Sequence, residues 1–541
     1  MREPKQIIFK PEEAEALCHK IRERKLSDVD AEILIGLVNG NVWVQHKLEE
    51  GKLTIRRLQK LFGVTTERLK NYKNKIETSA SLPKNSNSSN PPLKNHGRLP
   101  ESAYTGAEDI EVIHPDLAPG EICPEEACGG KLYEIKDAPM VIRIEGHPIA
   151  SAKRYKLQSL RCNICQTIFT APLPEGVHPT EKYDAGLKSL LLINKYFTSV
   201  PFYRQDVLQD FLGIPFPAST QWDVIKSTVP VLKPVYQALL ECAANSKGFY
   251  IDDTNARILE QIKANKKATR KKDKKACYTT GILAVNENYD VYLFITNAET
   301  SGKSFARIWE YRDPDLPTPY FMCDALYANI PKEINESLYL LCHCLSHARR
   351  NFYDLQGSFE ELAETVLGLI GTVYANDKHF KEQGMSDEER LKHHQLHSVP
   401  IMEQLKAYLE QYSKTHLAEP NGSAGKAIDY LLKRWDKFTR FTEHPGIPLD
   451  NNILEQALKI PIRNRKNALF YKTLFGAEVA GYAQSLIFTA AQNNVNPHDY
   501  LTTLLKHENE VINNPKMWLP WNYKEQLVPK ELATLCQESV N

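Results

Sequence analysis

Three acidic residues in separate parts of the chain have the types and settings that two-metal chemistry needs. Asp252 and Asp324 each follow an apolar run, and Glu455 lies on a short predicted helix within 450–459. Carboxylates from three segments can hold two divalent cations that activate the attacking oxygen and stabilise the leaving oxygen in a phosphodiester displacement. Mg²⁺ prefers such oxygen ligands. The sequence therefore predicts that Asp252 bridges two ions and that Asp324 and Glu455 each complete the coordination of one.

Each acid also has an ordinary structural interpretation. Asp252 and Asp324 could be strand-end aspartates at turns. Glu455 could be the capping-box partner of Asn452, three residues earlier, or could pair with Lys459 one helical turn later. Because all three acids occupy positions that fit a single fold, we favour the metal site.

The segments around these acids predict a sheet with helices. Apolar runs predict a strand from Gly248 and further strands at 278–285, 290–296, 319–324 and 337–344, with a helix at 301–312 after the third strand. An acid on the first strand, another at the tip of the fourth and a third on a later helix are typical of a ribonuclease H-like fold. Residues 359–440 predict amphipathic helices, so we place a helical insertion at about 355–445 within a catalytic domain at 246–510. The insertion is expected to contact DNA or a second protomer.

The N-terminal region predicts a DNA-binding module. Residues 54–70 read as helix, glycine turn and helix, the pattern of a helix-turn-helix whose second helix enters the major groove. A plain helical hairpin with a basic, solvated face has the same pattern. We assign 1–76 to this domain and 77–112, rich in Ser, Asn and Pro, to a flexible linker. The cations expected to contact DNA here are Arg56, Arg57, Arg68 and Lys70.

Two cysteine pairs predict a structural zinc site. Cys123 and Cys128 form the first pair, and Cys162 and Cys165 form the second, about 30 residues later. Turn-borne thiolate pairs at such a separation suit tetrahedral Zn²⁺ with no open coordination position. Disulfides are disfavoured in a reducing compartment. We therefore expect a zinc-ribbon-like module at 113–175.

A Cys-x-x-His pair, Cys344 and His347, has two interpretations. With the adjacent Cys342 and His343 it could bind a metal ion. Nothing in the sequence supplies a separate closed ligand set, which a structural metal site requires. We expect the cysteines to pack within a strand and His347 to lie at the start of a helix.

Residues 176–245 predict a helical domain that contains a second helix, glycine turn and helix, in which Ser219 can cap the second helix. This segment is less basic than the first, so DNA contact and a simple packing role are equal alternatives. A run of eight cations within 263–275 predicts a phosphate-binding loop, with a solvated loop as the alternative. The further cations expected to contact DNA are Arg270, Lys271, Lys272, Arg349, Arg350, Arg463, Arg465 and Lys466.

Composition limits the class of protein. The 541 residues include 68 basic and 67 acidic ones, so any affinity for nucleic acid must come from local patches. No apolar run approaches the length of a membrane span, and the start, Met-Arg-Glu-Pro-Lys, leads into no signal-peptide core. With an odd count of eleven cysteines, we expect a cytoplasmic, nucleoid-associated protein with no membrane partner.

Several motifs together resemble a known family. They are Asp252-Asp253-Thr254, Asp324-Ala-Leu-Tyr327, Cys344-Leu-Ser-His347-Ala-Arg349-Arg350-Asn-Phe352, Asp450-Asn451-Asn452-Ile-Leu-Glu455, Arg465-Lys466-Asn467 and the ending at 482–501. Through them, nearly the whole chain resembles the insertion-sequence 66 family of bacterial transposases. The resemblance implies an Asp-Asp-Glu catalytic triad, two Mg²⁺ or Mn²⁺ ions per active site, and cleavage and strand transfer of double-stranded DNA. It also implies terminal repeats and target DNA as partners, a homo-oligomer on DNA, and accessory proteins from the same element.

The chain departs from the family pattern at three positions. Ala325 follows the second aspartate where the family has Gly, Gln456 follows the glutamate where it has Arg, and Asp253 replaces a longer acid. None of these changes removes a member of the triad. A catalytically decayed copy, a related nuclease or integrase, and a zinc-containing DNA-binding regulator are the alternatives. The sequence thus predicts a multidomain α+β transposase with a C-terminal tail at 511–541.

Overall fold

The computed structural model describes most of the chain from residue 181 onward and short pieces before it. The described residues are 19–20, 27, 30–35, 118–122, 131, 149–161, 168–174, 177, 181–268, 270, 274–415, 419 and 421–527. The chain divides into two compact units, Met1–Arg143 and Ile144–Asn541. The predicted helix-turn-helix, the linker and the four zinc ligands lie outside the described residues, as do Lys271 and Lys272, so these remain predictions.

The second unit begins with a small hairpin. Strands β1 (Ser159–Arg161) and β2 (Ile168–Thr170) pair antiparallel. Cys162 and Cys165 lie in the interval that joins them.

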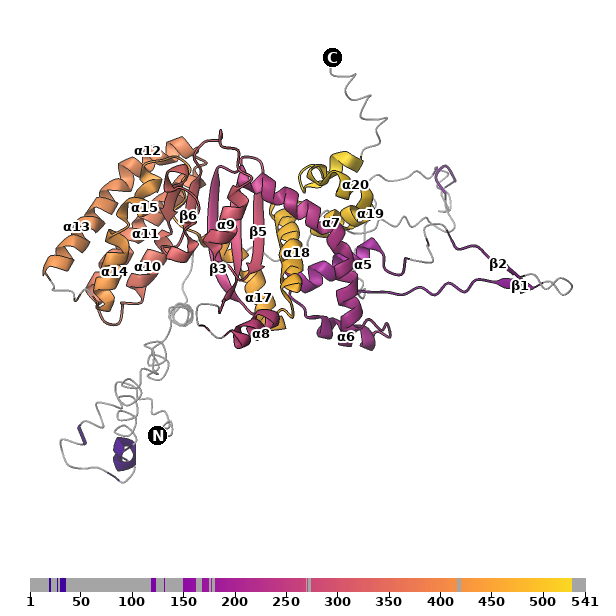
Figure 1. Ribbon diagram of the computed structural model, residues 1–541. Helices are drawn as coiled ribbons and strands as arrows, with labels where there is room; N and C mark the ends of the chain where they lie inside the picture. Colours follow the sequence, from indigo (N-terminus) through magenta and orange to yellow (C-terminus); the bar gives the residue numbers. More distant parts are fainter. Residues whose placement is uncertain are drawn as a thin grey trace, which may run out of the picture. The chain divides into compact units, whose positions relative to one another are not determined.

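A five-stranded mixed sheet forms the centre of the second unit (Figure 1). The strands are β3 (Gly248–Ala256), β4 (Cys277–Val285), β5 (Asp290–Asn297), β6 (Tyr320–Cys323) and β7 (Leu340–His343), in the spatial order β5-β4-β3-β6-β7. β4 is antiparallel to β3 and β5, whereas β6 is parallel to β3 and β7. This confirms the five predicted strands, and the order is consistent with a ribonuclease H-like catalytic domain.

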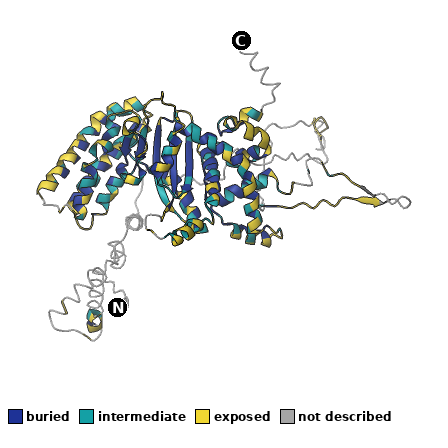
Figure 2. Ribbon diagram, in the orientation of Figure 1, coloured by how far each residue is buried: buried dark blue, intermediate teal, exposed yellow. Residues whose placement is uncertain are grey.

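Side chains on the two faces of the sheet enter two different cores, which explains why the strands read as nearly continuous apolar runs. The strands are accordingly mostly buried, as their dark blue colour in Figure 2 shows. Phe249 and Ile251 on β3 pack in the core that includes α7 (Ala218–Ala244), α9 (Ser301–Trp309) and α18 (Leu474–Gln492). Tyr250 points to the opposite face, where it packs with Leu454 and Leu458. Because strand side chains alternate, Asp252 shares the face of Tyr250.

Helix α18 covers the edge of the sheet at β5 (Figure 1). Three polar side chains spaced four residues apart, two on this helix and one directly after it, bond the backbone of β5. Ser485 Oγ accepts from the amide of Phe294 at 2.8 Å, Thr489 Oγ1 accepts from the amide of Tyr292 at 3.0 Å, and Asn493 bonds both backbone groups of Asp290. The edge strand therefore has hydrogen-bond partners on both sides.

Helices fill the interval between β7 and Glu455, as the periodicity of 359–440 predicts. They form a separate core that contains Leu345, Phe352, Val366 and Leu405. The helices are α10 (Leu345–Tyr353), α11 (Glu360–Glu382), α12 (Asp387–His397), α13 (Val399–Thr415), α14 (Ser423–Leu432), α15 (Trp435–Thr439) and η6 (Arg440–Thr442).

The other helices of the second unit precede the sheet, connect its strands, carry Glu455 or follow it. They are α5 (Ala185–Leu192), η2 (Ile193–Phe197), α6 (Phe202–Phe211), α8 (Leu259–Lys267), η4 (Tyr327–Asn329), η5 (Glu336–Leu338), α16 (Asn452–Ala457), α17 (Lys459–Ala468), α19 (Pro497–Lys506), α20 (Glu508–Asn513), η7 (Pro515–Trp518) and η8 (Tyr523–Leu527). Within the described part of the chain, no helix combines the length and the apolar character that crossing a membrane requires.

The predicted cap of α7 is wrong. Ser219 lies inside the first turn of α7, and the residue before the helix is Pro217. The free amide of Ala218 at this end donates instead to Asp206 Oδ2, on α6, at 3.1 Å. A carboxylate from the neighbouring helix thus replaces the local cap.

Candidate active site

Asp252 lies within β3, opposite Gly281 of β4. Its Oδ1 accepts a hydrogen bond from the amide of Asp253 at 2.8 Å. Burial raises the pKa of Asp252 to about 7, even though the Asp253 amide lowers it, and the negative charges of Asp324 and Glu455 raise it further. The carboxyl group therefore lies among like charges with too little solvent to screen them.

Asp324 directly follows β6, and a short network fixes its carboxylate. Oδ1 accepts from Asn329 Nδ2 at 2.6 Å and from the amide of Leu326 at 3.0 Å. Asn329 is fully buried, and its own Oδ1 accepts from the hydroxyl of Ser301 at the start of α9. The contact with Ser301 thus fixes the side-chain amide of Asn329, and the Nδ2 group of that amide in turn fixes the orientation of the Asp324 carboxylate.

Glu455 lies on α16, which a buried asparagine attaches to the sheet. Asn451 donates from Nδ2 to the carbonyl of Ile251 at 3.0 Å and from its backbone amide to Cys344 Sγ at 3.2 Å. Gly281 permits the close approach of α16, because a Cβ at this position would lie 2.8 Å from Leu458 Cδ2. These contacts set the position of Glu455 relative to β3.

The capping-box interpretation of Glu455 is wrong. Asn451, rather than Asn452, precedes the helix, and the amide of Asn452 donates to Asp450 Oδ1 at 3.0 Å. Within the described residues, the basic side chains that the Glu455 carboxylate meets are those of His347, at 3.6 Å from Nδ1 to Oε1, and Arg350, at 3.9 Å from Nη2 to Oε2. The carboxylate thus faces α10 instead of its own helix terminus or Lys459.

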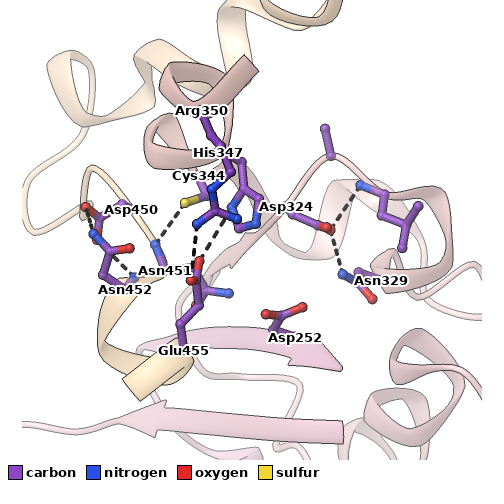
Figure 3. Close-up of polar contacts among 12 residues, drawn as sticks. Asp252, Asp324, Asn329, Cys344, His347, Arg350, Asp450, Asn451, Asn452 and Glu455 are labelled. Atoms are coloured by element: carbon purple, nitrogen blue, oxygen red, sulfur yellow. Dashed lines mark hydrogen bonds and ion pairs between the residues drawn. The ribbon is translucent and has the colours of Figure 1, made fainter. Parts of the chain in front are cut away.

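The three carboxylates come together although 72 and 131 positions separate them along the chain. In Figure 3 the side chain of Asp252 lies between those of Glu455 and Asp324. Burial and the negative charges of these neighbours raise the pKa of Asp252, which indicates that the three carboxylates repel one another. A divalent cation such as Mg²⁺, which prefers hard carboxylate oxygens, would offset this repulsion. The residues at this position could therefore hold the ions that the sequence predicts.

The cations expected near the acids have different environments. Arg463 donates to the carbonyl of Phe197 at 2.7 Å, and Arg465 donates to Thr254 Oγ1 at 3.1 Å and to the carbonyl of Asn255. Both guanidinium groups therefore tie α17 to other parts of the fold.

Three other cations from that prediction remain at the surface. Lys466 on α17 and Arg270, which follows α8, are exposed, and Arg349 on α10 is half-buried. DNA contact by any of these residues stays a prediction.

Helix α6, the first helix of the proposed second DNA-binding module, presents a mainly apolar surface. Exposed positions of α6 include Tyr203, Val207 and Phe211, and Phe211 is 81% exposed. Arg204 is the one basic residue of α6. Phosphate binding requires several cations, so this face offers little for it, and DNA contact by this module remains a prediction.

Comparison with known proteins identifies the family. The model described as Transposase IS66 family matches residues 181–479, more than half of the chain. The chain belongs to the IS66 transposase family. The match runs from just before α5 into α18 and includes all three acids, which confirms the resemblance inferred from the sequence.

Relatives of this transposase family member occur in Sinorhizobium fredii (strain NBRC 101917 / NGR234). The uncharacterized protein y4jD is 27% identical over 413 residues, which cover 74% of this chain and 78% of the relative. The uncharacterized protein y4hP is 22% identical over 436 residues, which cover 77% of this chain and 76% of the relative. The uncharacterized protein y4qI is 24% identical over 381 residues, with 68% and 67% coverage.

The sequence prediction missed three residues that position the acids of this IS66 family member. Asn329 orients Asp324, Asn451 attaches α16 to β3, and Gly281 allows that helix to approach. Asn451 lies within a motif that carries the family resemblance, so its presence was a usable signal. The roles of Asn329 and Gly281 depend on contacts between segments far apart in sequence.

Proposed function

We propose that this IS66 family member is an active DNA transposase that binds the ends of its element, cleaves them and transfers the strands to target DNA. Asp252, Asp324 and Glu455 are the proposed catalytic triad. The observation that carries the proposal is their convergence on one face of the sheet, where burial and mutual charge raise the pKa of Asp252 to about 7. Such a perturbed acid is typical of a functional site.

Each acid has a defined part in this proposal. Asp252 would bridge two Mg²⁺ or Mn²⁺ ions, while Asp324 and Glu455 would each bind one. When bound, the ions supply activation of the attacking oxygen and charge stabilisation at phosphorus. Asn329 keeps the Asp324 carboxylate in one orientation, and Asn451 keeps α16 against β3. The protein's contribution is thus to fix three carboxylates before metal and DNA arrive.

Two of the three residues that depart from the family pattern, Ala325 and Gln456, leave this arrangement intact. The amide of Ala325 donates to the hydroxyl of Tyr430 on α14 at 3.3 Å, which supports the loop that carries Asp324. Gln456 is exposed on α16 and points away from the buried face of that helix. Neither departure from the family pattern gives a physical reason for lost activity.

A strand-transfer assay with point variants tests this proposal. Purified full-length protein would be incubated with Mg²⁺, a duplex that ends in the element's terminal repeat, and a target plasmid. We expect Asp252→Asn and Glu455→Gln to lower strand transfer by about 10³-fold or more, while the mobility shift of the end duplex persists. The matched control is Asp315→Asn, an exposed aspartate outside the site.

Two results would contradict the proposal. Full strand transfer by Glu455→Gln would remove this residue from the triad. Sequence-specific DNA binding by the wild-type protein, without cleavage under any divalent metal, would favour a decayed copy or a DNA-binding regulator.

A further inference from the structure

A thiol, an imidazole and a carboxylate meet beside the proposed triad. The potential ligand atoms of Cys344, His347 and Glu455 all lie within 4.8 Å of one another. Cys344 directly precedes α10, His347 lies in its first turn, and Glu455 comes from α16 (Figure 3). The spacing of three residues puts the first two side chains on one side of the helix start. As the sequence predicts, the cysteines are buried at β7 and His347 lies at the start of a helix. Glu455, from a distant part of the chain, adds a third potential ligand.

Two of these atoms have no hydrogen-bond partner although they are buried. They are His347 Nδ1 and Glu455 Oε1, and they lie 3.6 Å apart. That separation is too long for a hydrogen bond. Two ligands at usual zinc distances in a tetrahedral site lie about 3.4 Å from each other. The gap therefore fits one ion that both atoms would bind.

The sulfur lies in a setting that can stabilise a metal thiolate. Cys344 Sγ accepts from the amide of Asn451 at 3.2 Å and stands at the N-terminus of α10, where the helix dipole favours negative charge. A bound cation would displace the thiol proton to solvent.

The second carboxylate oxygen has its own partner. Arg350 Nη2 lies 3.9 Å from Glu455 Oε2, on the far oxygen of the carboxylate. Oε1 is thus the oxygen that remains for an ion. The side chains of His347 and Glu455 are 22% and 27% exposed, whereas the two ligand atoms themselves are buried.

We propose that Cys344, His347 and Glu455 form a three-ligand binding site for a transition-metal ion of the zinc class. Mixed sulfur, nitrogen and oxygen ligands select Zn²⁺ or Co²⁺ over Mg²⁺. An ion there takes Glu455 away from Asp252 and Asp324, so zinc inhibits the Mg²⁺-dependent reaction. The inhibition rests on the proposed function, whereas the binding does not.

Cobalt titration of the full-length protein tests the binding. Co²⁺ reports a thiolate ligand through a charge-transfer absorption band. We expect the wild-type protein to bind one more Co²⁺ than Cys344→Ser and to show a larger thiolate band. The matched control is Cys342→Ser, a buried cysteine two residues earlier that is not part of the ligand group. Cys342→Ser should bind as many Co²⁺ ions as the wild-type protein. Any Co²⁺ bound at the predicted four-cysteine module contributes equally to all the proteins compared, so it does not affect the difference.

His347→Gln provides a second test that does not depend on changing a buried thiol. It should also lose one Co²⁺ equivalent. If Cys344→Ser and His347→Gln both bind as much Co²⁺ as the wild-type protein, with an unchanged thiolate band, the site does not exist.

The inhibition is measured separately. Zn²⁺ is added to the Mg²⁺-dependent strand-transfer assay, and each variant is compared with its own zinc-free rate. Half-inhibition of Cys344→Ser should need at least about 10-fold more Zn²⁺ than the wild type, since even an indirect partner of a metal ligand changes affinity this much. An unchanged inhibition constant would overturn the regulatory part while leaving the triad untouched. Absence of Mg²⁺-dependent strand transfer in the wild type, with the cobalt difference intact, would instead overturn the proposed function.

Discussion

Replacing Asp252 by asparagine should stabilise the metal-free protein at alkaline pH, although it removes a proposed catalytic residue. Burial raises the pKa of Asp252 from 3.8 to about 7. The folded protein therefore binds more protons than the unfolded chain between these two values, and its stability falls as the pH rises through this window. Above about pH 7 the folded state bears the whole cost of the buried charge, which asparagine does not have.

The structure sets the size of this effect. A shift of about 3 pKa units corresponds to about 4 kcal/mol of unfolding free energy. For a unit of about 400 residues, Ile144–Asn541, an unfolding entropy of about 2.1 cal/mol/K per residue converts this into a rise of about 5 °C in Tm. Because protonation already relieves most of the cost at lower pH, the difference should fall to less than half at pH 5.

Thermal unfolding in metal-free buffer from pH 5 to 8.5 measures this difference. The matched control, Asp315→Asn, replaces an exposed aspartate and should change the Tm little at any pH. Added Mg²⁺ should raise the Tm of the wild-type protein more than that of Asp252→Asn, because the ion compensates the charge that the variant lacks. A Tm for Asp252→Asn that is lower than the wild-type value at pH 8.5, or a difference that does not vary with pH, would refute this reasoning.

Three further substitutions test the contacts that position the site. Asn329→Ala should lower strand transfer at least about 10-fold and raise the Mg²⁺ concentration needed for half-maximal rate, because Asp324 loses its 2.6 Å partner; an unchanged Mg²⁺ requirement argues against this role. Gly281→Ala should displace α16 and lower the free energy of unfolding by about 1–3 kcal/mol. Its control, Gly357→Ala, adds a methyl group at an open position and should leave the Tm within about a degree in the same thermal scan. Thr489→Val should lower the free energy of unfolding by about 1–3 kcal/mol, measured by chemical denaturation, because it leaves backbone groups of β5 unpaired. A stability equal to that of the wild type would show that water replaces the hydroxyl.

The strands and two of the acids were predictable because their signals are local. β3 to β7 are apolar runs buried on both faces, and such runs read as strands without knowledge of the partner. Asp252 and Asp324 could be placed because each carboxylate belongs to a strand or follows one directly. The helical nature of 359–440 was likewise visible in its periodicity.

The environment of Glu455 was not predictable, because it depends on contacts between segments far apart in the sequence. Its partners His347 and Arg350 lie more than 100 positions earlier, and only the packing of α16 against β3 and β4 brings them near. Local capping rules favoured Asn452 as the residue before α16, but each of the three polar residues at 450–452 can take that position. Asn451 is buried and bonds Ile251, which no short-range rule indicates.

The closure of the β5 edge by α18 has a consequence for assembly. Proteins often associate by strand addition, in which an extended segment of one chain joins the open edge of another chain's sheet. Ser485, Thr489 and Asn493 already occupy the backbone groups of β5 that such a segment would need. Two copies of this chain therefore cannot join their sheets at this edge, and helices or loops must form any contact between copies there.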